Sequence, residues 1–303
     1  MDVDVVVIGA GPAGLAAALG LARQQRTVAL LDSNRPRHAA TLQSHGFITR
    51  DGISPLELRT IGRDEVLRYP TVSHERTLVR QIAAIDGGFE VQAEQPGSRA
   101  ESETRAAAVL IATGLSETLP VSQHVRPWYG TSLHSCMDCD GYDKRGQALA
   151  LIGETDDLVD RAMVIRRHTD DLAVFTNGAD AVSDAGEARL AEHGVALVRT
   201  PIAAIEGDRD GMRAIVLEDG SRSERTGGFV RPWWHAQLEF AEPLGIETDE
   251  DGLVVVDRTQ RTSVEGVYAA GDITPGFRQL AVAAGAGTIA ASVINRDLIA
   301  RGL

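Results

Sequence analysis

What the sequence lacks excludes several classes of protein. Its 303 residues include only two cysteines, too few for the disulfide framework of a small secreted protein. No apolar run reaches the roughly 20 residues that cross a bilayer, and no signal-peptide pattern is visible. Aromatic residues make up only 4%, and basic residues are outnumbered, so that the net charge is −13. We therefore expect a cytoplasmic protein that binds neither nucleic acid nor an anionic membrane surface.

The N-terminal 32 residues carry the pattern of a dinucleotide-binding unit. A β-branched run at 3–8 predicts a strand buried on both faces of a parallel sheet. A Gly-x-Gly-x-x-Gly turn follows directly at 9–14, and a helical run begins after it. Its glycines let the backbone approach a pyrophosphate at the helix N-terminus. A second strand ends at Asp32, where an acid should hold a ribose hydroxyl.

Both cysteines lie in one short motif, Cys136-Met137-Asp138-Cys139-Asp140. A Cys-x-x-Cys pair can form a small redox-active disulfide, and Asp140 is placed to move the proton that thiol–disulfide exchange requires. A zinc half-site is the alternative, with His124 and His134 as further ligands, but the chain has no second cysteine pair. Asp140 also has a structural alternative, as a residue that complements a helix dipole. We predict no metal.

The rest of the chain alternates strand and helix patterns. Strands are predicted at 77–85, 89–93 and 105–111, with a polar loop at 94–104, and a second, smaller α/β unit begins after a proline-containing boundary at 115–127. The segment 227–237 is interpreted as a return linker, and 252–256 and 266–270 as strands. Gly271-Asp272 then precedes a long C-terminal helix. Arg35 either meets a phosphate or is simply solvated.

These motifs resemble those of the low-molecular-weight, FAD-dependent thioredoxin reductases. The resemblance extends to Ala112-Thr113-Gly114 and to the run Thr262 to Asp272, which continues to Arg278-Gln279. The resemblance covers nearly the whole chain. It implies an α/β fold with two Rossmann-like dinucleotide-binding domains, and a homodimer. The FAD domain would be discontinuous, at 1–116 and 236–303, with the inserted domain at 117–235 carrying the cysteines. It also implies that Cys139 faces the flavin, that Cys136 attacks the outside partner, and that Asp140 is the acid–base.

We expect FAD contacts from positions spread over the predicted FAD domain and the loop that follows its second strand. They are Gly9, Gly11, Pro12, Ala13, Gly14, Asp32, Arg35, His45, Ala84, Thr113, Gly114, Gly271, Asp272, Arg278, Gln279 and Leu280. His45 also has a structural interpretation, as a buried, hydrogen-bonded histidine.

The inserted domain departs from the family where NADPH should bind. The turn after its first strand has Thr155 at the second glycine position and Leu158 at the third small position, and both side chains block close approach of a pyrophosphate. Three acids at the helix start, Glu154, Asp156 and Asp157, would also repel it. The basic cluster expected for a 2′-phosphate is replaced by 176–178, Thr-Asn-Gly. We conclude that the enzyme is not driven by NADPH.

The sequence therefore predicts an FAD-dependent thiol–disulfide oxidoreductase whose substrate is a small dithiol or disulfide, or a thioredoxin-like protein. Part of the chain looks more like dithiol oxidases that pass electrons to oxygen, namely the segment 44–52 and Arg231-Pro232-Trp233-Trp234. Asp140 matches the reductases better. The alternatives are an NADPH-dependent or ferredoxin-dependent thioredoxin reductase, and a non-enzymatic flavin redox sensor.

Overall fold

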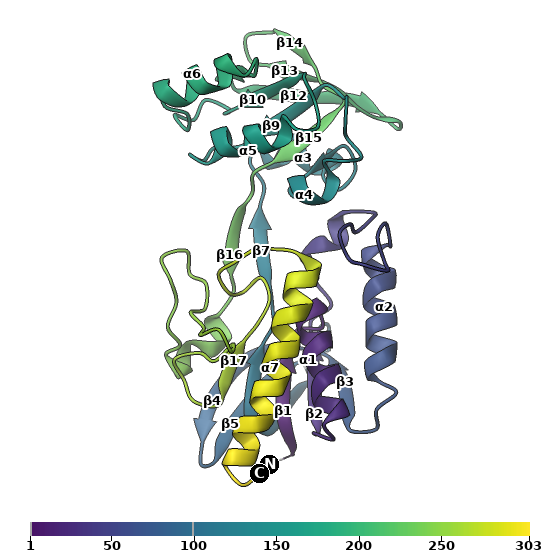
Figure 1. Cartoon of the computed structure of the whole chain (residues 1–303), viewed down its shortest axis with the longest axis vertical. Coiled ribbons are helices and arrows are strands. Elements are labelled where there is room, and N and C mark those ends of the chain that lie inside the picture. The colour runs from purple at the N-terminus through teal and green to yellow at the C-terminus, as the bar shows by residue number, and fades with distance from the viewer. Residues whose placement is uncertain (1, 99) are drawn as a thin grey trace. The chain divides into compact units, whose positions relative to one another are not determined.

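The structure is a computed structural model that describes residues 2–98 and 100–303 (Figure 1). Its internal contacts divide the chain into two units. The first contains Met1–Ala39, Gly46–Ser116 and His235–Leu303, and the second contains Ala40–His45 and Glu117–Trp234. The sequence placed its boundaries after 116 and after 235. The structure changes unit after 116 and after 234, and it also groups 40–45 with the second unit.

The first unit is built on one seven-stranded sheet. Its order is β3 (Val72–Arg76), β2 (Val28–Asp32), β1 (Val3–Ile8), β6 (Glu101–Ile111), β5 (Gly88–Glu94) and β4 (Leu78–Ile85), with β17 (Val267–Ala269) paired to β6. β3, β2, β1, β6 and β17 are parallel, whereas β5 is antiparallel to both β6 and β4. Because parallel strands end at the same edge, the residues that follow β1, β2, β6 and β17 meet there.

Three helices cover this sheet or extend from it: α1 (Pro12–Arg23), α2 (Pro55–Val66) and α7 (Leu280–Ala300). Figure 1 shows α1 and α7 side by side, and small residues allow that close packing. A Cβ added to Gly287 of α7 would lie 2.0 Å from the carbonyl oxygen of Ala13. Short segments η1 (Arg37–Ala40) and η3 (Glu239–Leu244) lie in the connections. The apolar, glycine-rich and alanine-rich sequence of α7 is thus explained by this helix contact.

We predict that Gly287→Ala lowers the apparent Tm although alanine is the better helix former. The clash with Ala13 should cost about 1–3 kcal/mol, more than the propensity gain of about 1 kcal/mol. Gly285→Ala is the matched control on the same helix, because a Cβ there meets no atom within 4 Å. It should leave Tm unchanged or raise it in the same thermal melt. A Gly287→Ala protein as stable as the control would show that the helices do not touch at this point.

The second unit has its own parallel sheet of five strands. The order is β11 (Ala196–Val198), β10 (Leu172–Phe175), β9 (Leu149–Ile152), β15 (Gly227–Val230) and β8 (Leu133–His134). The longer helices are α5 (Leu158–Ile165) and α6 (Asp184–Glu192), and the short ones are α3 (Ser122–Val125), η2 (Arg126–Trp128) and α4 (Met137–Asp140). An antiparallel sheet of β12 (Ile202–Asp208), β13 (Gly211–Leu217) and β14 (Arg222–Glu224) shares an apolar core with the parallel one. Where the chain passes between units, β7 (Leu115–Thr118) pairs with β16 (Trp233–Ala236).

The structure corrects three predictions of local structure. The predicted return linker at 227–237 begins with β15, whose four residues are all buried between β9 and β8. β6 begins at Glu101, inside the predicted loop 94–104, because residues 101–106 pair with β5. Residues 252–256 form no strand but one isolated bridge, between Thr248 and Val254. Among the residues described, no helix is long and apolar enough to span a membrane.

Candidate functional site

The glycine turn between β1 and α1 forms an open cradle. Gly9 has φ +105, and a Cβ there would lie 2.4 Å from the carbonyl oxygen of Ala112, so only glycine fits. Gly11 is the N-cap of α1 and has no side chain to bond the first N–H groups of the helix. A Cβ at Gly11 would meet no atom within 4 Å. The free N–H groups and the open space before them suit a pyrophosphate, so the turn fits the cofactor that the sequence predicts.

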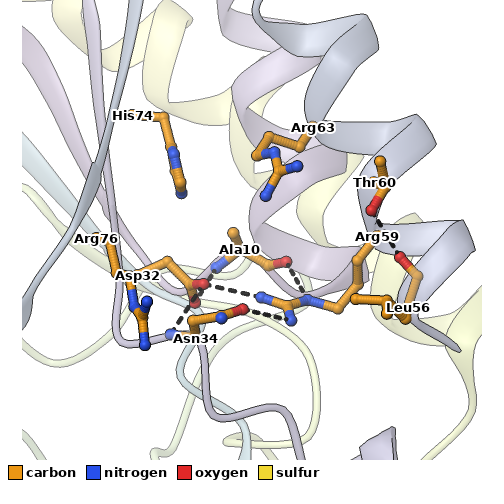
Figure 2. A pocket seen from close by; sticks show the side chains of 9 residues that line it. All are labelled: Ala10, Asp32, Asn34, Leu56, Arg59, Thr60, Arg63, His74 and Arg76. Atoms are coloured by element: carbon orange, nitrogen blue, oxygen red, sulfur yellow. Dashed lines mark hydrogen bonds and ion pairs between the residues drawn. The ribbon is translucent and has the colours of Figure 1, made fainter.

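Asp32, at the end of β2, faces this turn. Its Oδ1 accepts a hydrogen bond from the Ala10 N–H at 3.1 Å. Its Oδ2 accepts one from the Asn34 N–H at 3.1 Å and one from Arg59 Nη2 at 2.8 Å (Figure 2). Arg59 comes from α2, and the Asp32 and Arg59 side chains are 12% and 11% exposed. The sequence analysis missed Arg59, because nothing in the spacing of α2 shows which arginine turns toward β2.

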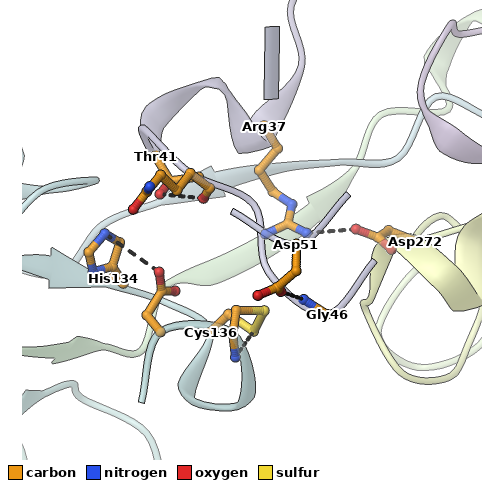
Figure 3. Close-up of a disulfide and its surroundings, with 10 residues drawn as sticks. Arg37, Thr41, Gly46, Asp51, His134, Cys136 and Asp272 are labelled. Atoms are coloured by element: carbon orange, nitrogen blue, oxygen red, sulfur yellow. Dashed lines mark hydrogen bonds and ion pairs between the residues drawn. A yellow bond between two sulfur atoms is a disulfide. The ribbon is translucent and has the colours of Figure 1, made fainter. Parts of the chain in front are cut away.

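A second carboxylate is paired in the same way. Asp272 follows β17 and accepts a 2.6 Å bond from Arg37 Nη2 (Figure 3). Gly271 lies against α1, since a Cβ there would be 2.9 Å from the Ala13 Cβ. Arg35, the arginine chosen from the sequence, is exposed, and Arg37 two residues later makes the contact instead. The glycine turn, Asp32 and Asp272 thus lie in one unit, with an arginine on each acid.

Of the other predicted cofactor positions, some lie near the glycine turn or at the start of α7, and two lie elsewhere. Thr113 and Gly114 follow β6 beside the glycine turn, since the Ala112 N–H donates to the Ile8 carbonyl. Arg278, Gln279 and Leu280 lead into α7, with Gln279 as its N-cap. Ala84 lies on the edge strand β4, opposite Phe89, and is exposed. His45 belongs to the second unit, where its Nε2 lies 3.2 Å from Asp143 Oδ2.

The cysteines lie on a short helix that follows β8. Cys136 and Cys139 are joined as a disulfide, with Cα atoms 5.3 Å apart (Figure 3). Cys136 is the N-cap of α4, and its Sγ accepts the Cys139 N–H at 3.2 Å. After reduction that N–H would favour the thiolate of Cys136 over its thiol. The local geometry therefore suits Cys136 for nucleophilic attack.

Asp140 is set up to exchange a proton near neutral pH. Burial, assisted by the charge of Asp143, raises the pKa of Asp140 to about 6, although Lys144 and His45 pull it down. His134 Nε2 lies 3.8 Å from Asp140 Oδ1. Burial and then Lys144 lower the pKa of His134 to about 4, so His134 is neutral at pH 7. The Lys144 Nζ is itself buried and donates to the Ser132 carbonyl at 2.9 Å. The sequence analysis did not identify Lys144.

The turn after β9, where the family's second dinucleotide site would be, is occupied by protein side chains. A Cβ added to Gly153 would lie 2.7 Å from Leu158 Cδ2 and 2.8 Å from the Arg231 Cβ. Asp157 Oδ2 accepts from Arg161 Nε at 2.6 Å and from Arg231 Nε at 2.9 Å. Arg231 also stacks over the Trp234 ring, 4.3 Å from its centroid. We call Asp157, Arg161, Arg231 and Trp234 the plug.

Asp157 is the one carboxylate among the four plug residues, and it lies against both arginines. Burial alone would raise the pKa of Asp157, but hydrogen bonds from Thr155, Arg161 and Arg231 together with the charge of Arg161 hold it below its usual value. Asp157 is therefore ionised at neutral pH and satisfies both arginines. Nearby, Asn177 donates to Glu154 Oε1 at 2.9 Å. Both arginines therefore already donate to Asp157, although two arginines and one carboxylate leave the plug with one uncompensated positive charge.

Comparison with known proteins places the chain in a family. Residues 3–287 match the family model for pyridine nucleotide-disulphide oxidoreductases. Thioredoxin reductase sirT of Leptosphaeria maculans is 31% identical, over 96% of this chain and 93% of that protein. A solved Bacillus anthracis structure assigned as thioredoxin reductase TrxB is 36% identical, with a TM-score of 0.92, and covers 99% of this chain and all of that one. The structure of HlmI is 32% identical with a TM-score of 0.90, over 98% of this chain and 92% of that one.

Proposed function

We propose that this chain is an FAD-dependent thiol–disulfide oxidoreductase that is not driven by NADPH. The chain belongs to the pyridine nucleotide-disulphide oxidoreductase family and is thioredoxin reductase-like, which confirms the predicted resemblance. The observation that carries the proposal is the Cys136–Cys139 disulfide followed by a half-buried Asp140 with a pKa of about 6. Together these residues supply a nucleophile, a resolving thiol and a proton carrier, which dithiol–disulfide exchange requires.

The first unit is proposed to hold FAD. The uncapped N–H groups at the start of α1, which the turn Gly9, Gly11 and Gly14 leaves open, would bind its pyrophosphate, and Asp32 and Asp272 would accept from its hydroxyl groups. When bound, FAD would take up an electron pair, a chemistry that no side chain supplies. The remaining predicted contacts stay predictions: Pro12, Ala13, Arg35, His45, Ala84, Thr113, Gly114, Gly271, Arg278, Gln279 and Leu280.

The exchange itself is carried by the chain's own residues. A substrate thiolate attacks Cys136 Sγ, the bond between the cysteines breaks, and Cys139 leaves as a thiolate. The second substrate thiol loses its proton to Asp140 and attacks the mixed disulfide, which releases Cys136 and closes the substrate disulfide. Two electrons then remain on the cysteine pair. With oxygen as final acceptor, one dithiol and one oxygen give one disulfide and one hydrogen peroxide.

The plug supports a reductant other than NADPH. A pyrophosphate entering over Gly153 would have to displace Arg231 and lie beside the ionised Asp157. Breaking such a partly buried, hydrogen-bonded pair and placing an anion next to a carboxylate are both unfavourable. The helix dipole offers only about 0.3–1 kcal/mol against this. We propose that the plug takes the place of a bound dinucleotide.

Two other functions are kept as alternatives. Asp140 and the names of the relatives favour a thioredoxin reductase that delivers electrons to a thioredoxin-like protein. Its electron donor in this alternative is ferredoxin or NADPH. A redox sensor would share the disulfide and the cofactor but would not turn over. We further propose that the two units act as a discontinuous FAD domain and an inserted domain, in a cytoplasmic homodimer.

Steady-state turnover tests the proposal. We predict that the FAD-loaded protein oxidises a small dithiol in air, consuming one oxygen per disulfide formed and releasing hydrogen peroxide. The same protein given NADPH and oxidised thioredoxin should form no free thiol above the no-enzyme rate. Thiol formation that depends on NADPH would identify an ordinary thioredoxin reductase, and a single stoichiometric oxidation without turnover would identify a sensor.

A further inference from the structure

An open pocket of about 220 Å³ in the first unit contains charged residues that the proposed chemistry does not use. We name it the basic pocket; Asp32, Leu56, Arg59, Arg63, His74 and Arg76 contribute to its lining (Figure 2). We propose that Arg63 and Arg76 hold the purine end of FAD by stacking on its ring. This inference rests on the proposed use of FAD and adds the residues that would select FAD over a shorter flavin.

The position of the basic pocket favours a nucleoside as its ligand. Ala10 of the glycine turn and Asp32 both line it, so it continues directly from the proposed pyrophosphate seat. Strands β2 and β3 are paired in register with Asp32 opposite Arg76, which places Arg76 next to the ribose-binding acid. The pocket is of a size for one nucleoside rather than a whole dinucleotide. Figure 2 shows His74 and Arg76 on one wall and Arg59 and Arg63 on the other.

Arg59 is already committed to the protein. Its guanidinium donates to Asp32 Oδ2 at 2.8 Å, to Asn34 Oδ1 at 3.0 Å and to the Ala10 carbonyl at 3.3 Å. These bonds come from three atoms of one planar group and fix its orientation. Arg59 is therefore a positioning residue that holds Asp32 toward the pocket, and it is not available to the ring.

In the part of the chain that the structure describes, Arg63 and Arg76, unlike Arg59, are not held in place by hydrogen bonds from their side chains. Within residues 2–98 and 100–303, Arg76 makes no side-chain hydrogen bond or ion pair, and Arg63 has only a long contact of 3.9 Å with its exposed neighbour Asp64. A guanidinium stacks well on a flat aromatic ring, and purines are bound in this way in other sites. Burial lowers the pKa of His74, with Arg63 and Arg59 acting in the same direction, so the histidine is neutral and can lie against the ring. Leu56, which is 71% exposed, adds an apolar rim.

A phosphate fits the pocket less well than a purine. Asp32 lies at the pocket, and its carboxylate would repel a phosphate carried on the ribose hydroxyls. A neutral purine nucleoside instead uses the acid for its hydroxyl groups and the two arginines for its ring. The arginines outnumber the carboxylate, but Asp32 lies where the ribose hydroxyls would be and opposes a phosphate carried on them.

Cofactor affinity of the full-length apoprotein tests the inference without measuring activity. Kd values for FAD and for FMN, which lacks the adenosine end, are measured by flavin fluorescence. Arg63→Leu and Arg76→Leu should each raise the Kd for FAD by about tenfold and leave the Kd for FMN unchanged. Arg68→Leu is the matched control, since Arg68 is exposed, follows the same helix and is outside the pocket. Far-UV circular dichroism of each apoprotein establishes folding.

Arg76→Lys separates stacking from charge. Lysine keeps the charge but loses the planar fork, so stacking predicts that it restores less than half of the lost affinity. Full restoration, equal losses for FAD and FMN, or unchanged FAD affinity in both leucine variants would overturn the inference. So would competition in which AMP carrying a 2′-phosphate displaces FAD better than AMP does. Failure of the wild-type protein to bind any flavin would instead contradict the proposed function.

Discussion

Replacing Cys139 with serine will reduce dithiol turnover by at least about a thousandfold, a loss typical of removing a group that acts covalently. Serine cannot form the disulfide with Cys136, so the enzyme has no oxidised form that a substrate thiolate can attack. Cys136 remains, with its Sγ facing the residue-139 N–H. The variant should therefore still react once with an external disulfide through Cys136 and stop there.

Mass spectrometry measures that single reaction. With a linear aromatic disulfide, the Cys136 thiolate forms one mixed disulfide and releases one aromatic thiolate, and no second thiol is present to resolve the product. Cys136→Ser is the matched control and should form the adduct far more slowly, because no N–H among the described residues donates to Cys139 Sγ as that of Cys139 does to Cys136 Sγ. Equal adduct formation in both variants, or residual turnover in Cys139→Ser, would contradict the assigned roles of the two sulfurs.

Asp140→Asn is expected to slow dithiol oxidation at pH 7 by about 10²- to 10⁴-fold, the usual contribution of a general acid–base. Asparagine keeps the size of the side chain but cannot take up a proton. Asp138→Asn is the matched control two residues earlier on the same helix, where the carboxylate is exposed. It should retain nearly full activity. Rates are compared at saturating FAD, so that cofactor affinity does not enter the comparison.

The pH profile of the wild type reveals which protonation state of Asp140 works. Burial raises the pKa of Asp140 to about 6. As a base in dithiol oxidation, the carboxylate is required, so the rate should fall as pH drops through about 6. As an acid in disulfide reduction, the protonated form is required, so that rate should fall as pH rises through about 6. Asp140→Asn should remove this fall in rate near pH 6. A fall that persists in the variant belongs to the titration of another group.

Local sequence signals predicted the framework well. The β-branched strand, the glycine turn and Asp32 lie where their spacing indicated, because each depends on neighbours within one βαβ segment. β15 was missed because its Gly227-Gly228 start resembles a linker, and only its two partner strands make it a strand. Short strands that are defined by distant partners give little signal in the sequence.

Contacts between side chains far apart in the sequence were the main feature that the sequence did not predict. The two arginines paired with Asp32 and Asp272, Arg59 and Arg37, come from segments whose orientation is set only by the folded unit. The departure of the turn after β9 from the family's glycine pattern was readable from Thr155 and Leu158. That Arg231, from beyond β15, fills the space was not, because a pair separated by 74 residues has no local signature.

Anaerobic mixing of the FAD-loaded protein with one reductant at a time tests the central claim most directly. The account predicts that a small dithiol bleaches the visible flavin absorbance in wild type but not in Cys139→Ser, and that NADPH leaves it unchanged over the same period. Rapid bleaching by NADPH, or bleaching by the dithiol that does not need Cys139, would contradict it.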